Sequence, residues 1–381
     1  MKKLPRQSLP VIMHHSVSED SSNIRVHPAI FEEQCRSLAE NGWTGISLDQ
    51  AEDFLINGAF LPKKSFLMTF DDGFLDNYVH AWPIMHKYGH KGVIFAVTDR
   101  ISEAQHNWEE RRASGQRPHR PTLADVWQGR CAKEDLPDVD NALRLDSLGH
   151  TVRQDQFFTW DEARLMEHSG VMSIAAHSVR HEQVFVGPVF SGFLRPGNRP
   201  RPFSHTAPTA FWGMPAFERA PGLAHRAFIP SPDLVEAITD LVPQEAAEAH
   251  AFFEDPAAVE RLRAVVEKHK DRLGSYESRE AQMLRHRAVM DSCRDVLARE
   301  LGHRVRSFCW PWGVFCEEAR EQGLAAGFEV FYTTRLGMNF SGDHLSVSRF
   351  KVKNRTDSWL INRLRVYSRP WLGSLYLKLR L

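Results

Sequence analysis

The stretch SFLMTFDDG, residues 65–73, runs a mostly apolar segment into two adjacent aspartates and a glycine. The apolar part is typical of a strand buried on both faces, and a glycine directly after it suits a bend in the chain. Adjacent carboxylates repel each other, so Asp71 and Asp72 need a partner at the end of such a strand. One interpretation is an Asp-Asp-Gly turn that closes a hairpin. The other is a cation site, in which one carboxylate binds the ion and its neighbour moves a proton.

Further short apolar runs rich in β-branched or aromatic residues predict strands elsewhere in the chain. They lie at residues 9–14, 91–97, 171–176, 305–310 and 329–334. Helix signals separate several of these runs, such as the T-x-x-E capping box of Thr159 and Glu162. Alternating strands and helices predict a parallel α/β sheet, open or closed into a barrel. Active sites in such folds lie at the C-terminal ends of the strands, where Asp71 and Asp72 stand.

Two segments interrupt the alternation of strands and helices. Residues 99–157 are polar, and residues 182–256 hold 11 of the 21 prolines together with many aromatic residues. The second segment is too apolar for plain disorder, so we expect an ordered excursion that leads into helices. The predicted main domain therefore spans residues 8–352, with insertions at about 99–157 and 183–280.

The composition is that of a globular protein without an overall electrostatic field. The 381 residues include 48 Lys plus Arg and 48 Asp plus Glu, so no net charge draws the chain to nucleic acid. The five cysteines are scattered and form no CxxC pair, which argues against a structural zinc site or a disulfide framework. The N-terminus has basic residues but only a short apolar run, so we expect a cytoplasmic protein.

A histidine pair supplies the second chemical signal. His177 and His181 are four residues apart and directly follow a predicted strand, a spacing that lets both rings point at one place. Each histidine taken alone could instead be an ordinary hydrogen-bonded residue. Two imidazoles with a strand-end carboxylate would form a minimal catalytic site for a divalent metal, with positions left for water and substrate.

Three motifs in order resemble a known family. TFDDG (69–73), HSVRH (177–181) and FCWPWG (308–313) resemble successive motifs of the polysaccharide deacetylases, carbohydrate esterase family 4. The likeness covers roughly residues 8–98, 157–182 and 280–352. It implies a distorted (β/α)7 barrel with long helical and Pro-rich insertions here. It also implies a hydrolase that removes N-acetyl groups, or O-acetyl groups, from an amino-sugar glycan or glycan precursor.

The resemblance also implies roles for individual residues. Asp71 would be the general base that takes a proton from water. The implied ligands of one divalent ion, Zn²⁺ before Co²⁺, Ni²⁺ or Mn²⁺, are Asp72, His177 and His181. The implied lining of the substrate groove is Pro311, Trp312 and Gly313.

The chain departs from the family pattern at two roles. Many members carry an arginine shortly before the motif proline, which pairs with the catalytic aspartate; the nearest basic residue here is Arg306, at an unusual spacing. Many also carry a late histidine as the acid, which this chain lacks. The early stretch VIMHHSV resembles the start of biofilm poly-N-acetylglucosamine deacetylases, whose histidine protonates the leaving amine. It implies His15 as the acid, with His14 directed away because neighbours on a strand face opposite sides.

Two other functions stay open at this stage. The departures would suit a carbohydrate-binding protein that kept the fold and lost turnover. The long insertion could also reshape the pocket for another non-peptide C–N bond. We expect a carbohydrate substrate in every case, and no nucleic acid.

The C-terminal tail, residues 353–381, is basic and aromatic. Residues 359–381 carry five basic side chains, four Trp or Tyr residues and no acid. One interpretation is a terminal helix packed on the domain and interrupted at Pro370. The other is peripheral contact with the inner face of a membrane, where a lipid-linked amino sugar would be the substrate.

Overall fold

A computed structural model describes residues 7–19, 24–140, 143–145, 151–153, 156–196 and 211–379. Its centre is a curled parallel sheet in the strand order β15-β14-β9-β6-β5-β1-β16, with β4 added beside β5. The strands of this sheet are β1 (Val11–His14), β4 (Thr44–Gly45), β5 (Ser65–Asp72), β6 (Gly92–Ala96), β9 (Met172–Ala176), β14 (Ser307–Cys309), β15 (Val330–Tyr332) and β16 (Phe350–Lys351). The predicted parallel α/β barrel of seven strands is confirmed, and each of the six predicted runs contains a strand of this sheet.

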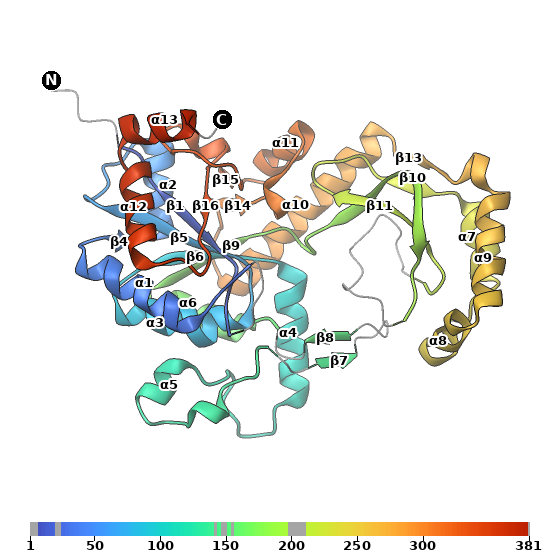
Figure 1. Ribbon diagram of the computed structural model, residues 1–381, viewed down its shortest axis with the longest axis horizontal. Coiled ribbons are helices and arrows are strands. Elements are labelled where there is room, and N and C mark those ends of the chain that lie inside the picture. Colours follow the sequence, from blue (N-terminus) through green and yellow to red (C-terminus); the bar gives the residue numbers. More distant parts are fainter. Residues whose placement is uncertain are drawn as a thin grey trace.

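Helices cover the outside of the curled sheet, as Figure 1 shows for the lobe that carries the chain termini. They are α1 (Pro28–Glu40), α2 (Leu48–Asn57), α3 (Trp82–Lys87), α6 (Trp160–His168), α10 (Arg279–Leu301), α11 (Glu317–Ala325), α12 (Asp357–Tyr367) and α13 (Pro370–Lys378). The helix α6 begins with the predicted capping box of Thr159 and Glu162. At the sheet edges, Val347 bridges to Tyr332 of β15, and shortly after it Phe350 pairs with Ile12 of β1. This segment brings the two edges of the curled sheet together.

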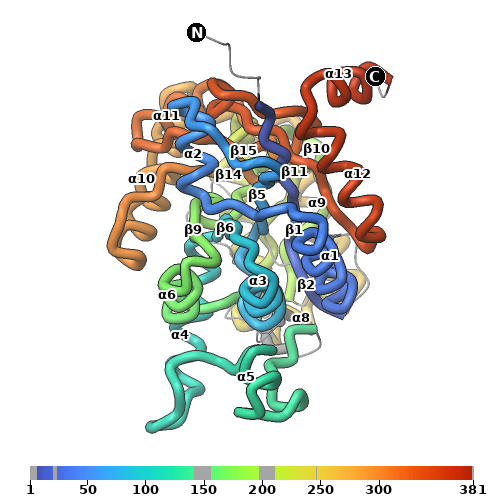
Figure 2. The backbone as a smooth tube through the Cα atoms, turned by 90° about the vertical axis from the view of Figure 1, so that its left-hand side faces the viewer, coloured from blue at the N-terminus to red at the C-terminus, as the bar shows by residue number. Residues whose placement is uncertain are grey.

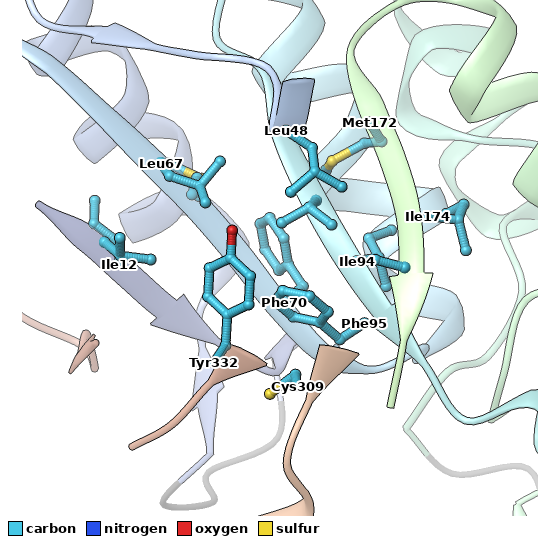
Figure 3. Packing of buried hydrophobic residues seen from close by; sticks show 14 of the residues in the cluster. Ile12, Leu48, Leu67, Phe70, Ile94, Phe95, Met172, Ile174, Cys309 and Tyr332 are labelled. Atoms are coloured by element: carbon cyan, nitrogen blue, oxygen red, sulfur yellow. The ribbon is translucent and has the colours of Figure 1, made fainter. Parts of the chain in front are cut away.

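The interior of this barrel is a dense apolar core. The side chains of Leu67, Phe95 and Tyr332 face inward, while Ile12 and Phe70 pack between the sheet and its covering helices; all five belong to one core cluster (Figure 3). The ring centroids of Phe95 and Tyr332 lie 4.8 Å apart. A core packed in this way fixes the strand ends, and therefore whatever side chains follow them.

The first insertion begins with the helix α4 (Thr98–Arg111) and continues through α5 (Leu123–Trp127) to the short hairpin of β7 (Leu143–Leu145) and β8 (Thr151–Arg153). Polar composition concealed α4 in the sequence, because only Thr98 and Ile101 of this helix are buried. A polar loop follows α4. It ends at Arg120, which forms a buried ion pair with Glu162 at 2.7 Å.

The second insertion builds a lobe with its own hydrophobic core, on the right of Figure 1. Its elements are β10 (Gln183–Phe193), β11 (Pro215–Pro221), β12 (Phe228–Pro230), β13 (Gly274–Tyr276), α7 (Pro232–Thr239), α8 (Ala246–Glu254) and α9 (Pro256–Lys268). Aromatic rings dominate this core; the Phe217 ring packs edge-on against both Phe185 and Phe228. The excursion predicted from the prolines and aromatics is therefore an ordered lobe beside the barrel.

Candidate active site

The two aspartates at the end of β5 are buried and face different partners. Asp71 and Asp72 are only 3% and 8% exposed, and both remain paired with β6. Asp72 has a φ of 77° and Gly73 a φ of 79°, so the chain bends sharply there. A Cβ at Gly73 would approach the Ile101 side chain to 2.8 Å, which favours glycine at this position. The bend therefore turns two adjacent carboxylates into two separate functional groups.

The first group is a set of three potential metal ligands. The Oδ1 atom of Asp72 lies 3.6 Å from Nε2 of His181 and 3.9 Å from Nε2 of His177. Ligand atoms of all three residues fall within 4.8 Å of one another. His177 directly follows β9, and its backbone N–H donates to the Ala96 carbonyl of β6. The structure thus brings Asp72, His177 and His181 together from two strand ends.

The protonation of the two histidines suits a cation. Nδ1 of His177 lies 2.8 Å from the Cys309 carbonyl, which can only accept, so Nδ1 carries the hydrogen and Nε2 keeps its lone pair. Burial lowers the pKa of His177, and it lowers the pKa of His181 to about 3, so both rings are neutral at pH 7. An outer hydrogen bond of this kind orients metal-binding histidines in general. The donor set of two neutral imidazoles and a carboxylate fits a divalent transition metal.

A second candidate cluster shares His177 with Asp71 and Cys309. Both oxygens of Asp71 already accept hydrogen bonds from Arg349, and the Cys309 Sγ atom lies 3.0 Å from the same guanidinium. A cation there would have to compete with a buried guanidinium for both Asp71 oxygens, whereas the hydrogen bond that Arg100 gives Asp72 goes to Oδ1. The Asp72 set is therefore the better candidate for a metal position.

Asp71 is held by a buried, two-point ion pair. Nη1 and Nη2 of Arg349 donate to its two oxygens at 2.7 and 2.8 Å, and the Arg349 side chain is 0% exposed. The same guanidinium also donates to the Thr333 carbonyl at 2.8 Å and to the Thr69 hydroxyl at 3.1 Å. Burial by itself raises the pKa of Asp71, but Arg349 and His177 outweigh burial and hold that pKa well below its usual range. Asp71 is therefore ionised and fixed in direction.

The arginine that pairs with Asp71 is Arg349 and not Arg306. Arg306, the nearest basic residue to the WPWG motif, points elsewhere and pairs with Glu329 at 2.8 Å. Arg349 directly precedes the last sheet strand, β16, and reaches Asp71 of β5. Sequence reasoning missed it because it follows the motif instead of preceding it. Its one signal was its place directly before the short strand of Phe350 and Lys351.

The two N-terminal histidines separate as strand alternation requires. His14 is buried, its ring stacks on Phe70 at 5.3 Å and meets Phe31 edge-on at 5.5 Å. His15 follows β1 on the opposite side, close enough that its charge contributes to lowering the pKa of both Asp71 and Asp72. Its Nδ1 atom is buried and has no hydrogen-bond partner among the residues that the structure describes. Of the pair, His15 is the one that faces the aspartates.

The motif Pro311–Gly313 forms a tight turn directly beside the histidines. The Trp312 ring is 41% exposed, and its centroid lies 3.9 Å from that of His181. A side chain at Gly313, where φ is 74°, would collide with Thr334, so the turn depends on glycine. Pro311 is buried beneath it. An exposed indole next to the candidate metal position is a surface on which a sugar ring could stack.

Arg100 is a site residue that the sequence did not indicate. It lies on α4, and its Nη1 atom is 3.1 Å from the same Asp72 oxygen that faces the two histidines. Its guanidinium also lies over the Phe157 ring at 5.2 Å. No motif distinguishes an arginine in a polar insertion, so only the fold reveals it.

Strained backbone concentrates at this site. Five non-glycine residues in the described part of the chain have a positive φ, and four of them belong here. They are Asp72, Ser178, His181 and Trp312. The His181 N–H donates to the Ser178 hydroxyl at 3.0 Å, which closes the loop between the two histidines. Left-handed conformations at such residues persist only where the surrounding fold enforces them, and they cluster at functional sites.

Comparisons with known proteins find a family model and curated relatives that match parts of the chain. Residues 60–191 match the family model described as polysaccharide deacetylase. YxkH of Bacillus subtilis (strain 168), named as a polysaccharide deacetylase, is 37% identical over 102 residues, or 27% of this chain and 36% of that protein. The poly-beta-1,6-N-acetyl-D-glucosamine N-deacetylase of Escherichia coli (strain K12) is 30% identical over 177 residues, or 46% of this chain and 21% of that protein. The chain thus spans about a third or less of these curated relatives.

Solved structures share the fold over nearly the whole chain. The de-N-acetylase from Aggregatibacter actinomycetemcomitans superposes with a TM-score of 0.58 at 18% identity, covering 94% of this chain and 99% of that one. The BpsB deacetylase domain from Bordetella bronchiseptica gives a TM-score of 0.52 at 18% identity, covering 92% and 98%. At these identities the likeness establishes the architecture.

Proposed function

We propose, from the polysaccharide deacetylase domain that this chain contains, that the site hydrolyses N-acetyl groups of an amino-sugar glycan with the help of one divalent metal ion. The main support for the proposal is that two adjacent carboxylates have different partners. Asp72 converges with His177 and His181 on one point, while Asp71 stands beside them, ionised and engaged by Arg349. A protein that only bound sugar would have no use for a separately held base next to a ligand carboxylate.

In this proposal Asp72, His177 and His181 hold the cation, with Zn²⁺ the first candidate. A divalent ion at that position supplies a Lewis acid for the acetyl carbonyl and for water. Asp71 accepts the proton of the attacking water through a lone pair that Arg349 leaves free, since a carboxylate offers about four acceptor sites. The low pKa keeps Asp71 ready to accept at any physiological pH, and the ion pair fixes its direction.

His15 is proposed as the acid that protonates the departing amine. It is placed by its own backbone, because the His15 carbonyl accepts a hydrogen bond from the Asn77 side chain at 2.9 Å. Histidine has a reference pKa close to neutrality and can therefore give up a proton under physiological conditions. Trp312 is proposed to stack on the sugar, with Pro311 and Gly313 shaping the turn that presents it.

Acetate release from an acetylated glucosamine oligomer tests the proposal. Protein stripped with a chelator and then given Zn²⁺, Co²⁺, Ni²⁺ or Mn²⁺ should release acetate and expose free amines. Asp71→Asn should lower the rate by on the order of 10²–10⁴ without loss of bound metal. Binding of the oligomer with no acetate release by the metal-loaded protein would favour the carbohydrate-binding alternative. Release of ammonia or ring opening of a cyclic amide instead would favour another C–N hydrolase.

The proposal also covers which amino-sugar substrate is used and where the protein acts. We place the protein in a reducing compartment at the inner face of a membrane, where a lipid-linked amino sugar competes with a soluble polymer as the substrate. Five free cysteines and the basic, aromatic C-terminal tail support that placement. No helix in the described residues is both long enough and apolar enough to cross a bilayer. Side-by-side rates on a soluble oligomer and on a lipid-linked acetylated amino sugar separate the two substrates.

A further inference from the structure

The terminal helix α13 has an apolar stripe on each of two opposite sides. Its inner side rests on the barrel through Gly373, Tyr376 and Leu377; a side chain at Gly373 would collide with Met338. Its outer side carries Trp371, Leu375 and Leu379, which are 68%, 52% and 79% exposed. Residues four apart on a helix follow one stripe, so these three side chains form a continuous apolar strip in water.

A basic cavity adjoins the start of α13. It has a volume of about 660 Å³ and is lined by Lys63, Lys64, Arg365 and Arg369, while none of its lining residues, all within the described chain, is acidic. Arg369 is also the residue that caps α13, so the cavity and the apolar strip adjoin each other. The Lys64 amine donates to a backbone carbonyl, whereas Lys63 and Arg369 are exposed at the rim.

The floor of this cavity holds a polar atom without a partner. Ser8 is 7% exposed and lines the cavity, and its hydroxyl is buried with no hydrogen-bond partner among the described residues. Buried hydroxyl groups are nearly always satisfied, so this one is available to an oxygen that enters the cavity, and the four basic side chains of the same lining favour a negatively charged one. An anionic oxygen meets both requirements.

We propose that this face docks on an anionic phospholipid bilayer, with the apolar strip of α13 inserted at the interface and a lipid phosphate in the basic cavity. Monotopic helices lie in the interface with apolar side chains among the acyl chains and basic residues at the headgroup level. Aromatic residues such as Trp371 favour that same boundary. Charge complementarity selects the occupant, because an apolar strip next to a cavity that four basic and no acidic residues of the described chain line is matched by an anionic lipid surface.

The docking face and the candidate active site lie at opposite ends of the barrel. The cavity is lined by Ser65, which begins β5, while Asp72 ends the same strand. A strand of 8 residues rises about 3.3 Å per residue, so roughly 25 Å separates the two. Figures 1 and 2 show α13 at the margin of the barrel lobe, and Figure 1 shows it far from α7 and α9. Membrane docking is therefore independent of the proposed chemistry and can be tested without a substrate.

Vesicle flotation measures the docking directly. The full chain should float with vesicles of phosphatidylcholine containing about a third phosphatidylglycerol, and stay in solution with phosphatidylcholine alone. The double variants Trp371→Ser/Leu375→Ser and Lys63→Gln/Arg369→Gln should each weaken partitioning on the order of 10-fold or more. Raising NaCl from about 0.1 to 1 M should weaken binding of the wild type, because the Debye length falls from about 10 to 3 Å.

Matched controls exclude a general loss of apolar or basic surface. Leu284→Ser removes an apolar side chain that is 70% exposed on α10, and Lys268→Gln removes an exposed lysine of α9; both should bind vesicles like wild type. Circular dichroism should give unchanged melting for every variant, since all the substituted residues are exposed. The proposal would be overturned if the wild type did not bind anionic vesicles. It would also be overturned if the two double variants bound them as well as wild type. So would a dimer that dissociates in Trp371→Ser/Leu375→Ser, since a second copy would then cover the strip.

Discussion

Replacing Arg349 by methionine should destabilise the barrel by much more than the loss of a typical side chain. Arg349 is fully buried and pairs with Asp71 through two hydrogen bonds of 2.7 and 2.8 Å. Methionine fills a similar volume but leaves the Asp71 carboxylate buried without a counter-charge. Removing one partner of a buried ion pair typically costs about 3–5 kcal/mol. In a chain of this length, that is on the order of 10 °C in Tm.

Thermal unfolding followed by circular dichroism measures the effect, and Arg306→Met is the matched control. Arg306 is the nearest basic residue to the motif, its side chain is 34% exposed, and its pair with Glu329 lies at the surface. The buried Glu52 lies 3.6 Å from Arg306, but Glu52 also accepts a hydrogen bond from Ser307 and burial raises its pKa, so it does not depend on Arg306 alone. A surface pair is worth at most about 1 kcal/mol, so this control should melt within a few degrees of wild type. The double variant Asp71→Asn/Arg349→Met should recover much of the loss, because no buried charge is then left alone.

The pH dependence of the Tm difference between Arg349→Met and wild type tests this explanation. In the wild type the pKa of Asp71 lies below its ordinary value of 3.8, so the pair stabilises the fold above about pH 4 and loses that effect as pH falls further. Arg349→Met removes the strongest charge that opposes burial, so the Asp71 pKa should rise and acid should neutralise the carboxylate that is left without its partner. The Tm gap between the variant and wild type should therefore narrow from pH 7 to pH 4. A gap that stays constant, or an Arg306→Met variant that loses as much, would refute this account of the buried pair.

The remaining predictions concern single histidines. His181→Ala should weaken Zn²⁺ binding more than 100-fold in a competition titration with a chromogenic chelator, whereas His303→Ala, a surface histidine beside Glu167, should leave it unchanged; equal affinities would move the metal elsewhere. His15→Gln should lower acetate release by on the order of 10²–10⁴ while Zn²⁺ affinity stays the same, and full activity would remove its role as acid. His14→Phe should remain active and resist acid better. Burial lowers the pKa of His14 from 6.5 to about 3, so its contribution to stability is present above pH 6.5 and is lost as pH falls toward 3. Unfolding curves across that range would contradict this if both proteins lost stability equally.

The sequence was sufficient for the sheet and for the candidate metal ligands because both signals are local. Each strand of the sheet that was predicted is a short apolar run, and Asp72 and the two histidines directly follow such runs. Parallel strands place their C-terminal ends at one edge, so residues about 100 positions apart could be expected to meet there. The bend at Gly73 was visible for the same reason, since glycine suits a left-handed conformation.

The parts that escaped prediction depend on distant pairing. Arg349 reaches Asp71 across 278 positions of sequence, and only the register of β16 beside β1 brings them together. Arg100 lies on a helix whose polar composition resembles a loop. The Pro-rich insertion revealed aromatic content but not that its rings would assemble into a second core. In each case, the decisive contact joins segments that no local pattern links.

The left-handed backbone at Asp72, His181 and Trp312 has a consequence for how the protein gains and loses its ion. Each such conformation costs on the order of 1–3 kcal/mol and persists only where the surrounding fold enforces it. The pairing of Asp72 with β6 and the hydrogen bond from the His181 N–H to Ser178 hold two of these conformations in place, so chelation should remove the ion without unfolding and reloading should need no slow refolding step. Which ion the site holds should then depend on which cation is available around the protein.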